Sequence, residues 1–160
     1  MGLDVRVYKN CRILDIDTAT EEQKENAIFA FVVDPSFECN IGKLQNEAYY
    51  IGNPAKAGLS CAYGSHRVFR EKLAELTGYD VNKIWENPNQ FKEAPFFRLI
   101  NFADNEGCID WATSEMLYND FVKFQSKAEV DFPAPLFGRY KEWMEVFRVG
   151  KEENCIIEFS

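Results

Sequence analysis

The sequence predicts an α+β fold, with a single domain over residues 1–160 in which about three helices pack on a mainly antiparallel sheet. Strand-like stretches rich in β-branched and aromatic residues dominate the first third of the chain, and apolar residues at helical spacing dominate the rest. A hydrophobic content of 46%, with 15% aromatic residues, is enough to form a core at this length without disulfides or metals.

The first part of the chain predicts two strands joined by a polar segment. Residues 3–14 alternate imperfectly between apolar and polar side chains, which indicates an opening strand with a break near Asn10. Residues 15–26 are polar and acidic, and they fit a surface loop or a short helix that begins near Thr20. Residues 27–34 are apolar and end at a proline, so we expect a buried strand there.

The middle of the chain predicts further strands. Residues 37–51 indicate a hairpin that turns at 42–43 and ends at 52–54, where Gly, Asn and Pro follow one another. Residues 95–102 are short, apolar and aromatic, which is typical of another buried strand. Between these segments, residues 80–85 fit one further turn of helix.

Three longer helices are predicted, followed by a closing strand over 155–159. The first runs from Ser65, a good N-cap, to Gly78, and the others cover 113–128 and 136–150. Their apolar faces have residues three or four positions apart and consist of Phe69, Leu73 and Leu76, then Leu117, Phe121 and Phe124, then Leu136, Tyr140, Trp143 and Phe147. We expect Trp143 to be a core residue.

The charge and the distribution of apolar residues exclude several function classes. The formal net charge is −8, which argues against nucleic-acid binding through direct phosphate contacts, because such binding requires a basic face. No apolar run approaches the roughly 20 residues of a membrane-spanning helix, so we expect no membrane partner. The first residues carry no signal-peptide pattern, which favours a cytoplasmic location.

The cysteines and glycines indicate no metal and no cofactor. The chain has five widely spaced cysteines, no Cys-x-x-Cys motif and one histidine, so we expect free thiols in a reducing compartment. No phosphate-cradling glycine loop and no Gly-x-Ser-x-Gly motif occurs. Asp15 and Asp17 are spaced like the paired aspartates of phosphoryl-transfer hydrolases, but the strand before them is interrupted and Ala19 stands where that pattern has Thr. We therefore assign no catalytic residue, cofactor or metal.

The densest polar cluster surrounds the predicted start of the first helix. Tyr63, His66 and Arg67 lie close together in sequence, and Arg70 follows one turn later. A helix N-terminus offers free N–H groups and a positive dipole end, and arginines add donors for an anion. His66 could also exchange protons near neutral pH, with Arg70 on the same helical face. The alternative is that Ser65 simply caps the helix and the other side chains are surface residues.

A second polar cluster lies in the turn before the next helix. Asp104, Glu106 and Asp110 could gather around a divalent cation, but their spacing does not match a calcium loop. Carboxylates that begin a helix are the favoured interpretation, because its dipole stabilises them. The two clusters together supply the candidate ligand-binding residues Tyr63, His66, Arg67, Arg70, Asp104 and Glu106.

Short motifs along the chain also carry a resemblance. They are the opening Met-Gly-Leu-Asp-Val at 1–5, the Tyr-Gly-Ser segment leading into an arginine-bearing helix at 63–73, the Asp-x-Glu-Gly turn at 104–107, and the Tyr-x-x-Trp helix at 140–143 before the last strand. Together these segments resemble a group of small uncharacterised proteins from bacteriophages and bacteria. Members of that group tend to end in His after the last Phe, whereas this chain has Ser160 there. The resemblance implies a phage or prophage setting and supplies no reaction.

From these observations we expect a small acidic cytosolic binding protein, an accessory protein of phage or prophage that acts on a host protein. Its location would then be the cytosol of the bacterial host. One alternative is a small hydrolase or phosphoryl-transfer enzyme with an anion site at the helix that begins near Ser65. A second alternative is a structural or virion-associated protein. The sequence does not predict an oligomeric state.

Overall fold

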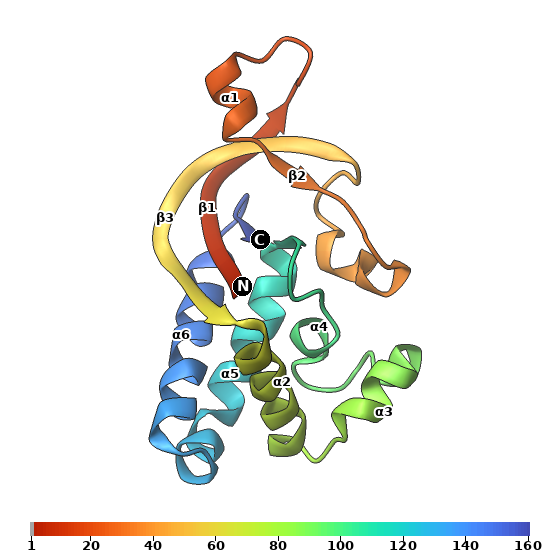
Figure 1. Ribbon diagram of the computed structural model, residues 1–160, viewed down its shortest axis with the longest axis vertical. Coiled ribbons are helices and arrows are strands. Elements are labelled where there is room, and N and C mark those ends of the chain that lie inside the picture. The colour runs from red at the N-terminus through yellow and green to blue at the C-terminus, as the bar shows by residue number, and fades with distance from the viewer. Residues whose placement is uncertain (1) are drawn as a thin grey trace.

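The computed structural model describes residues 2–160 and confirms the α+β class, with an antiparallel sheet on one side and helices packed against it (Figure 1). The sheet has the strand order β2-β3-β1-β5-β4. Its strands are β1 (Gly2–Leu14), β2 (Ile28–Ala30), β3 (Ala48–Ala62), β4 (Gly107–Asp110) and β5 (Ile156–Phe159).

The described residues contain more helices than the predicted three. The three long helices are present as α2 (Tyr63–Leu76), α5 (Trp111–Asp131) and α6 (Ala134–Gly150). The short helices α1 (Glu21–Glu25) and α3 (Val81–Glu86) lie where the sequence fits a short helix after Thr20 and a further turn over 80–85. The elements that were not predicted are α4 (Phe97–Ile100) and the 3-10 segments η1 (Pro35–Ile41) and η2 (Pro88–Gln90). Elements this short show no helical periodicity in the sequence, and several depend on a capping side chain such as Thr20 for α1 or Asp80 for α3.

The two long strands β1 and β3 arch over the helices (Figure 1). Their pairing is irregular in two places, between Arg6 and Tyr8 and between Lys9 and Arg12 of β1. The second irregularity contains Asn10 with a φ of 53°, so the predicted break in the opening strand is confirmed. Extra residues in one strand of a pair bend it and increase its twist, which accounts for the arch.

The main core lies between the sheet and helices α2, α5 and α6, which run below the arch in Figure 1. Val5 and Val7 of β1 enter it from the sheet, and Trp143 enters it from α6. Trp143 is fully buried, as the sequence predicts. The Tyr140 hydroxyl donates to the carbonyl oxygen of Phe121 at 2.5 Å, which joins α6 to α5 within this core.

A smaller core lies on the other face of the sheet, where the two edge strands approach each other. The thiol of Cys108 in β4 donates to the carbonyl oxygen of Phe29 in β2 at 3.6 Å. Segment η1 is held here by the buried Asp110, whose carboxylate accepts from the backbone N–H of Lys43 and from that of Thr113, both at 2.8 Å. Asp110 is therefore the N-cap of α5 and also ties that helix to the loop after η1.

Two strand predictions in the middle of the chain are wrong. The predicted hairpin over 37–51 is replaced by η1, which Asp34 caps, and by the first residues of β3. The predicted strand over 95–102 is the short helix α4, preceded by Phe96 in a left-handed conformation. Both segments are short, apolar and aromatic, and such runs do not distinguish a strand from a buried helical turn.

Two boundary predictions also fail. Strand β3 does not end at 52–54 but continues through Pro54 to Ala62. Proline is tolerated there because β2 pairs with β3 only up to Tyr50, so the edge of β3 opposite to β1 is free at Pro54. Of the strand expected over 27–34, only the three residues of β2 are a strand.

None of the helices in residues 2–160 combines the length and the apolar character needed to span a bilayer.

Candidate functional site: a groove between α2 and α6

Helix α2 begins directly at the end of β3, three residues earlier than predicted. Its N-cap is Ala62, which has no capping side-chain hydrogen bond, so Ser65 is inside the helix and is not its cap. Moving the start does not change which residues share a face, because that depends only on spacing. His66, Arg70 and Leu73 are buried, while Ser65 and Val68 are exposed.

His66 is a core residue and not a solvent-accessible base. It is 1% exposed, and its ring centroid lies 5.3 Å from that of Trp143. Neither ring nitrogen has a hydrogen-bond partner. Burial lowers the pKa of His66 to about 3, with smaller contributions from the positive charges of Arg70 and Arg139. His66 is therefore neutral at physiological pH and does not supply the proton exchange that the sequence suggested.

Arg70 is likewise used inside the protein. Its guanidinium donates to the carbonyl oxygen of Phe102 at 2.8 Å and to that of Ile100 at 3.3 Å. It also lies 3.6 Å from the Asp104 carboxylate and 5.2 Å from the ring centroid of Trp85. Two predicted site residues, Arg70 and Asp104, are thus brought together, and their contacts join α2 to the segment after α4.

Of the other four predicted residues, Arg67 lies beside this pair, over the same Trp85 ring. Tyr63 is half-buried and packs against the main core, whereas Glu106 is exposed. Arg67 is exposed, lies 3.3 Å from a carboxylate oxygen of Glu71, and stacks over Trp85 at 5.6 Å. Arg67 therefore shares the Trp85 ring with Arg70, and these two arginines lie together with Asp104. His66 faces Trp143 in the core instead, so the six predicted residues do not all converge on one cavity.

The opposite face of α2 borders a groove of about 650 Å³. Its other wall is the connection from α5 to α6 and the first turns of α6. The residues that line it are Gly64, Ser65, Val68, Phe69 and Lys72 from α2, and Pro133, Pro135, Leu136 and Arg139 from the other wall. Large and mainly apolar grooves with few polar groups are the usual form of a binding site.

The groove presents apolar side chains to solvent and only positive charge. Val68 is 48% exposed on its α2 wall, and Leu136 is half-buried on the other. The charged lining residues are Lys72 and Arg139, in a protein whose net charge is −8. Arg139 also donates to the carbonyl oxygen of Ser60 at 3.3 Å, which fixes the end of β3 beside the groove.

The sequence contained part of the signal for this groove. Ser65, Val68 and Lys72 recur at i, i+3 and i+7, which places them on one helical face, and Phe69 lies at the buried border of that face. An apolar Val68 on that outer face was the one indication that it is more than a solvated surface. The second wall lies more than 60 residues away in sequence, so only the tertiary structure brings the walls together.

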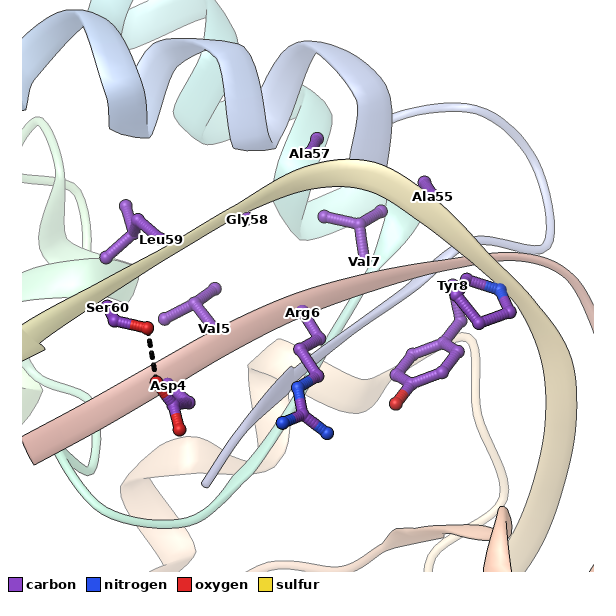
Figure 2. Close-up of a pocket in the computed structure, with 11 residues that line it drawn as sticks. Asp4, Val5, Arg6, Val7, Tyr8, Ala55, Ala57, Gly58, Leu59 and Ser60 are labelled. Atoms are coloured by element: carbon purple, nitrogen blue, oxygen red, sulfur yellow. Dashed lines mark hydrogen bonds between the residues drawn. The ribbon is translucent and has the colours of Figure 1, made fainter.

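A second cavity, of about 460 Å³, lies where β3 bows away from β1 (Figure 2). Arg6 pairs with Gly58 and Tyr8 with Pro54, so three residues of β3 stand opposite Val7 alone. Figure 2 shows Val7 and Leu59 on the α6 side of the strands and Arg6 on the other side.

Several polar side chains around this second cavity already have partners within the protein. Asp4 accepts a hydrogen bond from the Ser60 hydroxyl (Figure 2). Burial and the nearby carboxylate of Glu158 raise the pKa of Tyr8, and burial raises the pKa of Glu158, which Arg6 opposes. The cavity follows from the irregular strand pairing and has fewer exposed apolar groups than the α2–α6 groove, so the groove is the better candidate site.

Metal and disulfide chemistry receive no support within residues 2–160. No group of three or more His, Cys, Asp or Glu side chains is placed to hold a metal ion there. The cysteines are present as free thiols at positions 11, 39, 61, 108 and 155. Burial raises the pKa of Cys11 to about 12 and also raises that of Cys155, so neither thiol is activated as a nucleophile.

Comparison of the chain with protein-family models, with curated proteins and with solved structures finds no match.

Proposed function

We propose that this protein is a small binding protein that takes up a segment of another protein in the groove between α2 and α6. The observation that carries the proposal is the apolar groove itself, in which Val68 and Leu136 present uncovered apolar surface between two helices. An apolar groove between helices is the form in which amphipathic protein segments are commonly bound. The resemblance to phage and bacterial proteins favours a protein of the bacterial host as the target.

The polar side chains on the inner face of α2 make their contacts inside the protein, which also supports binding over catalysis. His66 is neutral and enclosed, and Arg70 is engaged by two backbone carbonyls and by Asp104. Neither side chain can take part in acid–base chemistry on an external substrate without leaving the core. The groove, in contrast, is open and has no titratable carboxylate among its lining residues.

Selection from a displayed peptide library tests this proposal without knowledge of the natural target. The protein is used to enrich yeast-displayed random peptides of about 15 residues, long enough to span α2. Individual peptides are then measured against the wild type and against Val68→Glu. We expect enriched peptides with apolar side chains at helical spacing, and we expect Val68→Glu to weaken their binding by about tenfold or more, because it places a charge in an apolar contact.

Val122→Glu is the matched control. Val122 is 49% exposed on helix α5 and is not among the residues that line the groove, so its exposure equals that of Val68 while its position differs. It should leave binding unchanged. Failure to enrich any saturable binder, or equal losses in the two variants, would overturn the proposal.

A further inference from the structure

The outer edge of β3, which is the side that faces away from β1, has no strand beside it over most of its length. β2 pairs with β3 only up to Tyr50, so this edge is open from Ile51 to Ala62 (Figure 1). Pro54 interrupts the open stretch because it has no N–H to donate, and α2 begins directly after Ala62. The part that can pair with another strand therefore lies between Pro54 and α2.

The hydrogen bonds of β1 show which backbone groups point out of this edge. The N–H of Asp4 donates to the carbonyl oxygen of Ser160 at 2.8 Å, and the N–H of Ser160 donates to that of Asp4 at 2.9 Å, so the backbone of Asp4 faces away from β3. Asp4 lies opposite Ser60, which makes these two a non-hydrogen-bonded pair of β1 and β3. The N–H and C=O of Ser60 therefore point outward, in agreement with the hydrogen bond that the Ser60 carbonyl accepts from Arg139.

The same orientation extends along the strand to Gly58 and Lys56. The residues that alternate with them belong to the main core or pack against it, namely Ala55, Ala57, Leu59 and Cys61. The side chains therefore alternate regularly, and the directions of the backbone groups alternate with them. Lys56, Gly58 and Ser60 are all exposed and present their N–H and C=O groups to the open side, and we call these three residues the β3 edge.

The β3 edge is complementary to itself. In an antiparallel pair aligned on Gly58, that glycine lies opposite its equivalent in a second copy, and Lys56 lies opposite Ser60 of the second copy. Each outward N–H then meets an outward C=O, because the two edges have the same spacing. No side chain stands at the centre of the pair, and the two lysines are about 13 Å apart along the strands, which is more than a Debye length at physiological salt.

Charge also favours this pairing. The Ser60 hydroxyl donates to the Asp4 carboxylate (Figure 2). Residues paired across strands share a face of the sheet, so Lys56 of the second copy lies in one row with Ser60 and Asp4. Neither Lys56 nor Asp4 takes part in an ion pair within residues 2–160. The pairing therefore brings an unpaired ammonium group to an unpaired carboxylate, and symmetry repeats the contact.

The other charges near this row already have partners. Arg139, which lies beside Ser60, is paired with Glu142 at 2.8 Å. Arg6 lies opposite Glu158 of β5, and its positive charge opposes the rise that burial causes in the pKa of that carboxyl group. Asp4 is therefore the charge that Lys56 of the second copy meets.

We infer that two copies of this chain associate through the β3 edge, as an antiparallel strand pair with a two-fold axis at Gly58 and with Lys56 of each copy beside Asp4 of the other. About five residues per copy form a smaller contact than the roughly 1,000 Å² of a stable interface, so the dimer is weak and reversible. The inference goes beyond the proposed function, because it does not depend on what the α2–α6 groove binds. A dimer carries two such grooves and would bind a partner with two segments more tightly than one copy does.

Sedimentation velocity and amide hydrogen exchange of the full chain test this inference. Both are measured at about 10 µM and about 1 mM protein, in about 0.15 M NaCl so that the net charge of −8 is screened. We expect a monomer at the lower concentration and a dimer at the higher one. The amides of Gly58 and Ser60 should exchange about tenfold more slowly at the higher concentration, whereas that of Leu59, which already faces Val5 of β1, should not change.

Exchange of the two charges tests the contact itself. Lys56→Glu and Asp4→Lys should each weaken the dimer by about tenfold, because like charges then face each other, and the double variant should restore it. Lys83→Glu makes the same change of charge on an exposed residue of α3 and should leave the dimer unchanged.

Three results would overturn the inference. A monomer at both concentrations, with fast exchange at Gly58 and Ser60, would leave the β3 edge open to an extended segment of another protein. A dimer that persists in both single variants would place the contact elsewhere. A double variant that is folded by circular dichroism but stays monomeric would show that Lys56 and Asp4 do not meet.

Discussion

Helix α2 has two faces with opposite roles, although both derive from the same fourteen residues. On the inner face, His66 and Arg70 are polar residues used for internal contacts, one against Trp143 and the other with the backbone after α4. On the outer face, Val68 is an apolar residue left uncovered. The polar and titratable residues that the sequence suggests for catalysis or ligand binding are structural. The apolar residue Val68, which has no reactive group, borders the groove.

This contrast shows that residue type alone does not distinguish a binding face from a core face. A buried polar side chain costs free energy unless it finds partners, so Arg70 is held by two carbonyls and a carboxylate. An exposed apolar side chain costs little in a monomer and becomes useful when a partner covers it. Substitutions on the two faces should therefore differ, with inner-face changes affecting stability and outer-face changes affecting binding.

The largest effect is expected where α6 packs beneath the inner face. Trp143→Ala should lower the free energy of unfolding by about 3–5 kcal/mol, because it removes a fully buried aromatic ring that stacks on Phe147 and contacts His66 and Phe159. Denaturation in urea measures the change. A loss below about 1 kcal/mol would contradict the account of the core.

A somewhat smaller loss is expected from Arg70→Met, which retains the length of the side chain and removes its charge. We expect about 3 kcal/mol, because the carbonyl oxygens of Ile100 and Phe102 lose their donor. Arg67→Met is the control, because Arg67 is an exposed arginine one helical turn before Arg70. It should lower the free energy of unfolding by less than about 1 kcal/mol. Equal losses in these two variants would show that Arg70 is not an internal anchor.

Mild acid should destabilise the protein through His66. Its pKa is held at about 3 by burial, below its ordinary value of 6.5, so the unfolded chain takes up the proton first as the pH falls. The stability due to the neutral ring is complete above about pH 6.5 and is lost progressively toward pH 3. At pH 5 the loss should be about 2 kcal/mol. Comparison with His66→Phe isolates the effect, since the variant lacks the titrating group; parallel stability curves for the two proteins would contradict the buried, neutral state.

The smallest stability effect is expected on the outer face. Val68→Glu should change the free energy of unfolding by less than about 0.5 kcal/mol, as is usual for an exposed helix position. Chemical denaturation beside Val122→Glu provides the comparison. A loss above about 2 kcal/mol would mean that Val68 belongs to the core, and the division between the two faces would then fail.

Much of the fold could be predicted because its largest elements carry strong periodic patterns. The helices over 113–128 and 136–150 and the closing strand are present, since each has several apolar residues at regular spacing. Segments α4 and β4 have four residues each, and such short elements are determined by their neighbours. The continuation of β3 past Pro54 required knowing which edge of that strand is free.

The candidate site was less predictable for a similar reason. The sequence analysis singled out the N-terminal end of α2, which borders the groove, but it did so from the polar residues His66, Arg67 and Arg70. Which face of a helix is covered depends on packing partners, and here the inner face is covered by residues from α6 and from the segment after α4. The second wall of the groove, including Leu136, is distant in sequence and has no motif that links it to α2.

The most direct test of the two-face account is to map a display-selected peptide onto the protein by backbone amide NMR shifts. The account predicts that the largest shifts occur at Gly64, Ser65, Val68 and Lys72 on α2 and at Leu136 and Arg139 on α6, with little change around the strand cavity of Figure 2. The largest shifts at residues 4–8 and 55–60 would place binding at that cavity instead and would contradict the account.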